Sequence, residues 1–557
     1  MRWFESGIGY QIYPQSFLDT NGDGIGDMRG IIQKLDYFCE LGVTFLWIGP
    51  IYQSPQDDGG YDISDFYHVD PRYGSDQDLK ELLAKAHQKG LRILLDLVMN
   101  HSSDQHPWFL ESRESVDNPK RDYYIWRKGK NGGPPNNWES FFSESAWQYD
   151  KLTDMYYMKI FSAHMPDLNW ANPEVRQEMF ALAKYWLDLG VDGFRLDAIS
   201  HLSRDESFRD SRKRADATGF VPDWSKFSNR PKVFEYLKDF RHQVLDNRDV
   251  LAVGEVGGGA SVGLARKFSD PLDGGFDLVF TFDHCWQNDS FGNDTKEDQK
   301  FEVQVDKLKA VFDRWYRGMH QDRMLVVYWL NHDHPRVLSQ YGDTGVYRKE
   351  SAKMLANTLY FLYGTPFIYQ GEEIGMSNVT YQKISDFRDV SAQNYYKSAK
   401  DRLSKAQILK FLQRTSRINA RTPMQWDDGE HAGFTTGSPW VKVNDNYLKV
   451  NVKDQMADPD SIWHHYQKVL TLRKEPKIRK AIIHGKLKWL HLRHPDIFAY
   501  SKITDELTLT VISNFRNREI EFPLGEYREI HCHNYPDLLI RNHKIVLRPY
   551  ESVVVFA

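Results

Sequence analysis

The chain has 557 residues, of which 41% are hydrophobic and 27% charged, a balance typical of a folded globular protein and not of a disordered one. Its length exceeds that of one ordinary domain and allows a large core with appended modules. The formal net charge of −5 offers no basic surplus for a phosphate backbone, so we expect no nucleic-acid partner.

The sequence favours a cytoplasmic protein. The N-terminus, MRWFESGIGYQIYP, has no basic stretch followed by an apolar region, and no apolar run reaches membrane-spanning length. Cys39, Cys285 and Cys532 are far apart and odd in number, so they predict neither a disulfide framework nor a metal site. We therefore expect a cytoplasmic location, no membrane partner, and a monomer or weak homo-oligomer.

Short apolar runs recur along the chain, and each leads into a helical pattern. Near-continuous apolar strands indicate burial on both faces, as in a parallel sheet wrapped by helices. The series predicts a (β/α)8 barrel, with a doubly wound open sheet as the alternative. The runs are IGYQIY near residue 10, TFLWIGP from Thr44, LRILLDLV from Leu91, VDGFRLDAI from Val191, VLAVGEV from Val250, FDLVFTF from Phe276, MLVVYWL from Met324 and TPFIYQGE from Thr365.

Two intervening helices have clear start and stop signals. Ser75 can cap a helix whose apolar residues share one face and which ends at Gly90. Asn172 followed by Pro173 opens another, which runs to Gly190.

Uneven spacing predicts two further domains. The stretch 102–170 is rich in Gly, Asn, Pro and Trp and is too long for a plain connection, so it predicts a small domain inserted between barrel segments 1–101 and 171–477. From 478 to 557 the pattern becomes alternating, with Leu507, Leu509 and Val511 on one face. This predicts a C-terminal antiparallel β domain.

Acidic residues stand at three predicted strand ends, where such barrels carry their active sites: Asp197 in GFRLDAI, Glu255 in VGEV and Asp333 in LNHDHPR. Glycoside cleavage needs two carboxyl groups, and a third can stabilise the cationic transition state. One such acid alone more often caps a helix or anchors a loop. Three acidic residues at the same end of the predicted barrel favour a catalytic site.

The surroundings of two of these acids suggest different roles. Strand periodicity places Arg195 on the same face as Asp197, so its guanidinium should keep that carboxylate ionised, as a nucleophile requires. Glu255 should lie among apolar strand residues and near other carboxylates. Both effects raise the pKa of a carboxyl group toward that of a working acid.

Four segments resemble, in order and spacing, the signature regions of the α-amylase superfamily, glycoside hydrolase family 13. They are DLVMNH (96–101), GFRLDAISH (193–201), GEV (254–256) and NHD (331–333). NPKRDYYIWRKGK, PDLNW, IYQGEEIGM and NARTPMQWDDGEHAGFT are similar to the oligo-1,6-glucosidase and α-glucosidase branch. The resemblance covers nearly the whole chain and is weakest near the C-terminus.

The resemblance implies a retaining mechanism in which Asp197 attacks the anomeric carbon, Glu255 is acid and then base, and Asp333 holds the sugar hydroxyls. It also implies substrate-binding residues, among them a pair, Asp58 and Arg421, that closes the pocket and makes the enzyme exo-acting. For the aromatic residues, core packing is the simpler interpretation of spacing alone. The implied binding residues are Asp58, Tyr61, His101, Phe142, Phe161, Arg195, Ala198, His332 and Arg421.

The loop Asp19-Thr-Asn-Gly-Asp-Gly-Ile-Gly-Asp27 alternates oxygen ligands with glycines, like the first part of an EF-hand. Gly30 stands where an EF-hand has its last glutamate, and an Asx-rich turn without an ion is the alternative. The resemblance implies a structural calcium ion, with magnesium as the alternative, held by Asp19, Asn21, Asp23, the Ile25 carbonyl and Asp27.

Two departures from the family pattern bear on the substrate. Ala198 follows the predicted nucleophile, where strict α-1,6 enzymes of the branch usually carry Val, and Met165 stands where the branch usually shows Gln. A smaller side chain changes the pocket shape beside the leaving sugar, an effect worth about 1–3 kcal/mol. We predict an α-glucosidase acting on maltose and short oligosaccharides, mainly at α-1,4 bonds with some α-1,6 cleavage.

Three other enzymes remain as alternatives: an oligo-1,6-glucosidase, a phosphotrehalose hydrolase, and a sucrose isomerase or other transglycosylase. The stretch QRTSRINART (413–422) lacks the Arg-Asp-rich loop of sucrose isomerases, which makes that alternative weaker. A non-catalytic, transporter-associated member is disfavoured because all three acids are retained.

Overall fold

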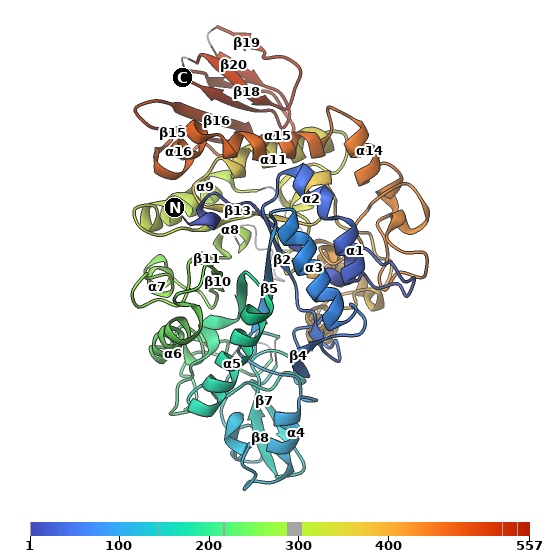
Figure 1. Cartoon of the computed structure of the whole chain (residues 1–557), viewed down its shortest axis with the longest axis vertical. Helices are drawn as coiled ribbons and strands as arrows, with labels where there is room; N and C mark the ends of the chain where they lie inside the picture. Colours follow the sequence, from blue (N-terminus) through green and yellow to red (C-terminus); the bar gives the residue numbers. More distant parts are fainter. Residues whose placement is uncertain (1, 143, 216–217, 287–302, 526, 543) are drawn as a thin grey trace.

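The computed structural model describes residues 2–142, 144–215, 218–286, 303–525, 527–542 and 544–557. A parallel barrel forms the middle of the molecule (Figure 1). The C-terminal β-sheets lie at one end of its long axis, and a small unit containing β7 and β8 lies at the other.

The eight apolar runs form the eight strands of one parallel sheet. Its order, β11-β10-β9-β5-β2-β1-β13-β12, follows the chain without a reversal, and β11 contacts β12. This order confirms the (β/α)8 barrel, because a doubly wound sheet reverses its strand order at a switch point. The strands are β1 (Gly9–Ile12), β2 (Phe45–Ile48), β5 (Arg92–Val98), β9 (Gly193–Asp197), β10 (Leu251–Glu255), β11 (Leu278–Phe280), β12 (Val326–Val327) and β13 (Thr365–Tyr369).

The helices predicted from their end signals are present. Ser75 caps α3 (Asp76–Gln88) in a capping box with Asp78, and Asn172 caps α5 (Pro173–Leu189), which ends at the left-handed Gly190. The other helices before the C-terminal region are α1 (Met28–Gln33), α2 (Leu35–Leu41), α4 (Pro107–Glu114), α6 (Lys232–Phe240), α7 (Val262–Phe268), α8 (Asp283–Trp286), α9 (Val305–Met319), α10 (Val337–Tyr341), α11 (Arg348–Tyr360), α12 (Val390–Ala399) and α13 (Lys405–Thr415).

The segment predicted as an inserted domain contains α4 and a small antiparallel sheet of β6 (Trp126–Arg127), β8 (Met155–Met158) and β7 (Trp147–Asp150). A hairpin of β3 (Tyr52–Gln53) and β4 (Asp65–Val69) precedes it in the chain. The core cluster of the inserted segment, which includes Trp138 and Trp147, also contains Phe227 from beyond residue 170. The connection after β9 therefore shares a core with the insert.

The C-terminal strands form two antiparallel sheets. One has the order β14-β15-β16-β21-β18 and the other the order β17-β20-β19. Helix α16 (Pro476–His484) runs across the boundary predicted at 477/478, so the first strand begins only at Lys486. The strands are β14 (Lys486–Trp489), β15 (Ile497–Ile503), β16 (Thr508–Asn514), β17 (Ile520–Pro523), β18 (Glu529–His533), β19 (Ile540–Arg541), β20 (Lys544–Leu547) and β21 (Ser552–Phe556), preceded by helices α14 (Val452–Ala457) and α15 (Ile462–Lys474).

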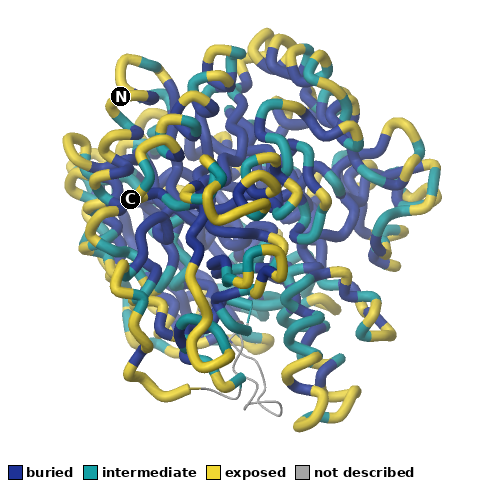
Figure 2. The backbone as a smooth tube through the Cα atoms, turned by 90° about the horizontal axis from the view of Figure 1, so that it is seen from below, coloured by how far each residue is buried: buried dark blue, intermediate teal, exposed yellow. Residues whose placement is uncertain are grey.

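Burial follows this arrangement. Buried segments run through the interior and exposed ones through the peripheral loops (Figure 2). Among the residues that the structure describes, none of the helices combines the length and apolar character needed to cross a bilayer.

Candidate active site

Three carboxylates on neighbouring barrel strands share one guanidinium. Arg195, 1% exposed, donates from Nη1 to Asp96 Oδ1 and to Asp197 Oδ1, each at 2.8 Å. Its Nη2 forms an ion pair with Glu255 Oε2. These residues come from β5, β9 and β10, which pair in parallel with Asp96 beside Arg195. Asp197 and Glu255, predicted from separate motifs, thus lie against the same side chain.

Because Asp197 shares the Arg195 guanidinium with Asp96 and Glu255, its carboxylate receives less stabilisation than the sequence predicts. Burial, with repulsion from Asp96 and Asp333, raises the pKa of Asp197 to about 7, although Arg195 lowers it. Arg195 thus favours the charged form of Asp197, as expected, but burial and the neighbouring carboxylates oppose it. One positive charge divided among three carboxylates cannot offset the desolvation of each.

Asp333 lies between a histidine and two arginines. Its Oδ1 is 3.1 Å from Arg421 Nη2 and 3.2 Å from Arg417 Nη1, and its Oδ2 is 3.3 Å from His332 Nε2. Burial raises the pKa of Asp333, but these neighbours outweigh it and hold the pKa well below the usual range. Since burial also lowers the pKa of His332 and keeps that ring neutral, we ascribe the effect mainly to the arginines. Asp333 is ionised.

Arg417 forms ion pairs with three carboxylates of the site. Its guanidinium contacts Asp58 through Nη2 and Asp389 through Nε, the latter at 2.7 Å, in addition to Asp333. Arg421, predicted together with Asp58, instead donates to Asp333 and to the carbonyl of His332, the latter at 3.0 Å. The residues of the predicted pair are brought to the same place, but the direct ionic partner of Asp58 is Arg417.

The two predicted histidines are held in defined orientations. His101 Nδ1 lies 3.2 Å from Asn100 Nδ2, so Nε2 carries the proton and can donate. Gln11 Nε2 lies 2.8 Å from His332 Nδ1, which leaves His332 Nε2 to face Tyr61 and Asp333. Burial lowers the pKa of His101 to about 3, so it is a neutral donor.

The predicted aromatic residues surround this group instead of filling a distant core. Tyr61 stacks on His332 at 5.2 Å, and its hydroxyl donates to Asp96 Oδ2 at 2.9 Å. Phe161 meets the His101 ring edge-on at 5.3 Å and contacts Phe142 at 5.9 Å. The Phe142 ring in turn lies 5.5 Å from the Arg417 guanidinium. Apolar faces beside fixed polar groups suit a sugar ring.

Ala198 and Met165, the two departures from the family pattern, are both buried. Ala198 has a left-handed backbone with φ of 50° immediately after β9, which turns the chain sharply behind Asp197. A β-branched residue is strained in that conformation, so a small side chain fits the turn.

Five residues of the site were not predicted. Asp96 and Gln11 lie in two of the predicted strand segments, and strand alternation could have placed Asp96 on the inner face of the DLVMNH strand. Arg417 and Asp389 meet Asp58 only through long-range folding. Tyr13 stacks with His332 at 6.0 Å and lies 5.3 Å from the Arg421 guanidinium.

The predicted metal loop is held by its own backbone. Asp19 Oδ1 accepts from the N–H groups of Asn21 and Gly22, Asp23 Oδ1 from Ile25, and Asp27 Oδ1 from Gly30. The bonds of Asp19 and Asp23 are those of Asx turns, and that of Asp27 caps the start of α1. Within the described ranges, no group of three or more His, Cys, Asp and Glu side chains is arranged to hold a metal ion. In the structure the carboxylate oxygens of the loop thus accept from backbone N–H groups, and calcium stays a prediction.

Chelation tests that prediction. If calcium binds the folded loop, EDTA should lower the Tm by a few degrees and added calcium should restore it, with magnesium less effective, because an ion bound only to the folded state stabilises it by mass action. Turnover at low temperature should not change. In Asp23→Asn, which lacks one predicted ligand charge, EDTA should have less effect. A wild-type Tm insensitive to EDTA would contradict the prediction.

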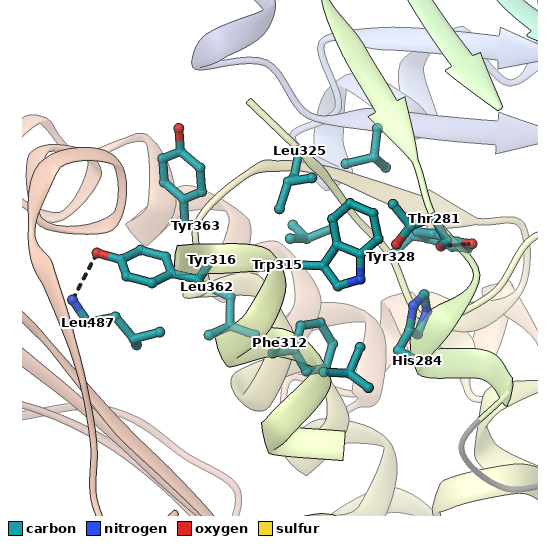
Figure 3. Close-up of a pocket in the computed structure, with 13 residues that line it drawn as sticks. Thr281, His284, Phe312, Trp315, Tyr316, Leu325, Tyr328, Leu362, Tyr363 and Leu487 are labelled. Carbon is teal, nitrogen blue, oxygen red and sulfur yellow. Dashed lines mark hydrogen bonds between the residues drawn. The ribbon is translucent and has the colours of Figure 1, made fainter. Parts of the chain in front are cut away.

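A separate cavity of about 30 Å3 lies between α9, β12 and the start of the C-terminal domain, where Tyr316, Tyr363, Trp315 and His284 line it (Figure 3). Leu487 N donates to Tyr316 Oη across its edge at 3.0 Å. It is too small for a sugar ring, and its described lining includes none of the predicted site residues. It is not the candidate site.

The chain is similar to several known proteins along nearly its whole length. Residues 11–481 match the family model described as alpha amylase, catalytic domain. The chain is 43% identical to an oligo-1,6-glucosidase of Bacillus cereus over 99% of both chains. Among solved structures, a Bacillus licheniformis trehalose-6-phosphate hydrolase aligns over 100% of both chains with a TM-score of 0.93 and 39% identity. The isomaltulose synthase of Erwinia rhapontici NX5 aligns over 100% of this chain and 99% of its own, with a TM-score of 0.93 and 34% identity.

Proposed function

Since the chain belongs to the α-amylase family and is a glycoside hydrolase, we propose that it is a retaining, exo-acting α-glucosidase that releases terminal glucose from maltose and short oligosaccharides. The observation that carries the proposal is the contact of Asp197 and Glu255 with the single Arg195 guanidinium, in a site where Arg417 pairs with Asp58.

The proposed reaction has two steps. Asp197 attacks the anomeric carbon, the glycosidic bond breaks, and Glu255 gives its proton to the departing oxygen. A water deprotonated by Glu255 then cleaves the glucosyl ester and restores both carboxyl groups. A retaining mechanism requires the two carboxyl groups to be about 5–5.5 Å apart, and their common contact with one guanidinium supports this closeness.

Exo-action is supported by the ion pairs at the Arg417 end of the site. The ionic group of Arg417, Arg421, Asp58 and Asp333 provides several fixed donors and acceptors for the hydroxyls of a terminal sugar. It also blocks passage of a longer chain in that direction. We infer that the non-reducing glucose ends against these residues.

We infer the preferred glycosidic linkage from Ala198, the residue that follows the proposed nucleophile Asp197. Ala198 favours α-1,4 bonds, and relatives named oligo-1,6-glucosidase support additional α-1,6 cleavage. Kinetics on maltose, isomaltose, sucrose, trehalose and trehalose 6-phosphate test this. We expect kcat/KM to be highest for maltose, with isomaltose next. A preference for trehalose 6-phosphate, or an isomer formed from sucrose, would identify one of the two other activities found among similar structures.

Ala198→Val should shift the preference toward isomaltose. Two added methyl groups change the space beside the leaving sugar, and we expect the maltose-to-isomaltose ratio of kcat/KM to fall by about tenfold. The left-handed backbone should also make the variant slightly less stable. Ala198→Ser, which adds no branch, is the control and should keep most of the ratio. An unchanged ratio in the Val variant would show that Ala198 does not set the linkage.

We further propose a cytoplasmic enzyme that takes only small oligosaccharides as partners, with a structural calcium ion in the loop from Asp19 to Asp27. Cell fractionation tests its location, and light scattering of the purified protein tests the predicted monomer or weak homo-oligomer.

A further inference from the structure

A line of aromatic rings leads from the candidate active site to the molecular surface. Phe161, which meets the His101 ring, stacks on Phe141 at 5.4 Å. Phe141 contacts Trp224 at 5.3 Å with the rings inclined at 41°. Trp224 is 38% exposed, although burial of such a large apolar side chain normally stabilises a protein. The last ring of the line is thus open to solvent.

The segment that carries Trp224 is fastened to the loop after the predicted acid. Asn229 Nδ2 donates to the carbonyls of Gly257 and Gly258, at 3.1 and 3.3 Å, directly beyond Glu255 at the end of β10. Ser228 Oγ lies 2.8 Å from His201 Nδ1 in the loop after β9. Since the acid protonates the departing oxygen, this side of the site receives the leaving sugar.

Trp224 is also held in a fixed position. It opens the short helix η5 (Trp224–Lys226), and Phe227, which is fully buried, donates from its backbone N–H to the Trp224 carbonyl at 3.0 Å. The preceding Asp223 accepts from Ser211 and Ser225, both at 2.7 Å. A preorganised ring loses little conformational entropy when a ligand covers it.

We propose that Trp224 forms an acceptor-side subsite that stacks on the second sugar beyond the scissile bond, and so favours α-glucosyl oligosaccharides of three or more units. The inference rests on the proposed α-glucosidase function. With the terminal glucose held at the Arg417 end, additional units of a longer substrate extend on the side of Glu255, whose following loop is bonded to the segment that carries this ring.

Kinetics on a chain-length series test the subsite. We expect Trp224→Ala to lower the trisaccharide-to-disaccharide ratio of kcat/KM by about five- to tenfold in whichever of the maltose or isomaltose series the wild type hydrolyses, because the variant loses one aromatic face. Trp224→Phe should keep most of the ratio. Trp224→Leu keeps an apolar side chain but has no aromatic face, so its ratio should fall as in Trp224→Ala.

Tyr185→Ala is the matched control, since Tyr185 is 39% exposed and lies on the outer helix α5. Its ratio should equal that of the wild type. A ratio unchanged in both Trp224→Ala and Trp224→Leu, or an equal loss on disaccharide and trisaccharide, would overturn the subsite. Failure of the wild type to hydrolyse either disaccharide would instead overturn the proposed function.

Discussion

Asp197→Asn should fold normally and lose turnover by about four orders of magnitude or more, because an amide cannot form the glucosyl ester. Measurement of kcat on maltose checks this, and circular dichroism checks the fold. Asp496→Asn is the matched control: it removes a carboxylate paired with Arg516 and Arg518 in the C-terminal domain and should leave kcat near the wild-type value. Substantial activity in Asp197→Asn would mean that another group is the nucleophile.

The same variant should reveal the raised pKa of Asp197. That pKa is about 7 in the folded protein against an ordinary value of 3.8, so the native state holds its proton more tightly and loses stability as pH rises between these values. Asparagine has no such proton. The Tm of Asp197→Asn relative to wild type should therefore increase from pH 4 to pH 8, and wild-type kcat/KM should fall as pH drops below about 7. A Tm difference independent of pH would contradict the assignment.

Glu255→Gln should affect natural substrates far more than activated ones. Without a proton donor, kcat/KM on maltose should fall by about 10³- to 10⁴-fold, because a sugar alkoxide leaves poorly. On 4-nitrophenyl α-glucoside, whose leaving group needs no proton, the first step should be much less impaired. A burst of nitrophenol should then appear because the glucosyl ester accumulates when water has no base to activate it.

The comparison of the two substrates is its own control. A general loss of folding or binding would lower both rates equally and leave no burst. Equal losses on maltose and the nitrophenyl glucoside would therefore contradict the role of Glu255 as the acid. Addition of azide, a nucleophile that needs no base, should accelerate release of the glucosyl group from Glu255→Gln and yield the α-azide if the reaction retains configuration.

The parts of the fold that were predictable depend on local sequence. Continuous apolar runs marked all the barrel strands, and the cap at Ser75 marked the start of α3. The partners of Asp58 were not predictable in this way, because Arg417 stands 359 positions further along the chain. Its motif, SRINART, carries two arginines, and only the packing of the folded chain determines which one contacts Asp58.

The raised pKa of Asp197 also could not be predicted from the local sequence. Alternation along β9 placed Arg195 beside it, but it did not reveal that Asp96 and Glu255 would contact the same guanidinium from adjacent strands. Electrostatics within a site depend on the number of neighbours that share each charge, and that number is set by strand register.

Phe227, in the connection after β9, packs in one core with Trp138 and Trp147 of the inserted segment. Phe227 is followed by Ser228 and Asn229, whose bonds end on His201 and the glycines behind Glu255. Movement of the small β6–β8 unit against the barrel should therefore displace the loop that follows Glu255, the proposed proton donor. Substitutions in the core of the β6–β8 unit should therefore change the reaction rate, although the substituted residues contact no sugar.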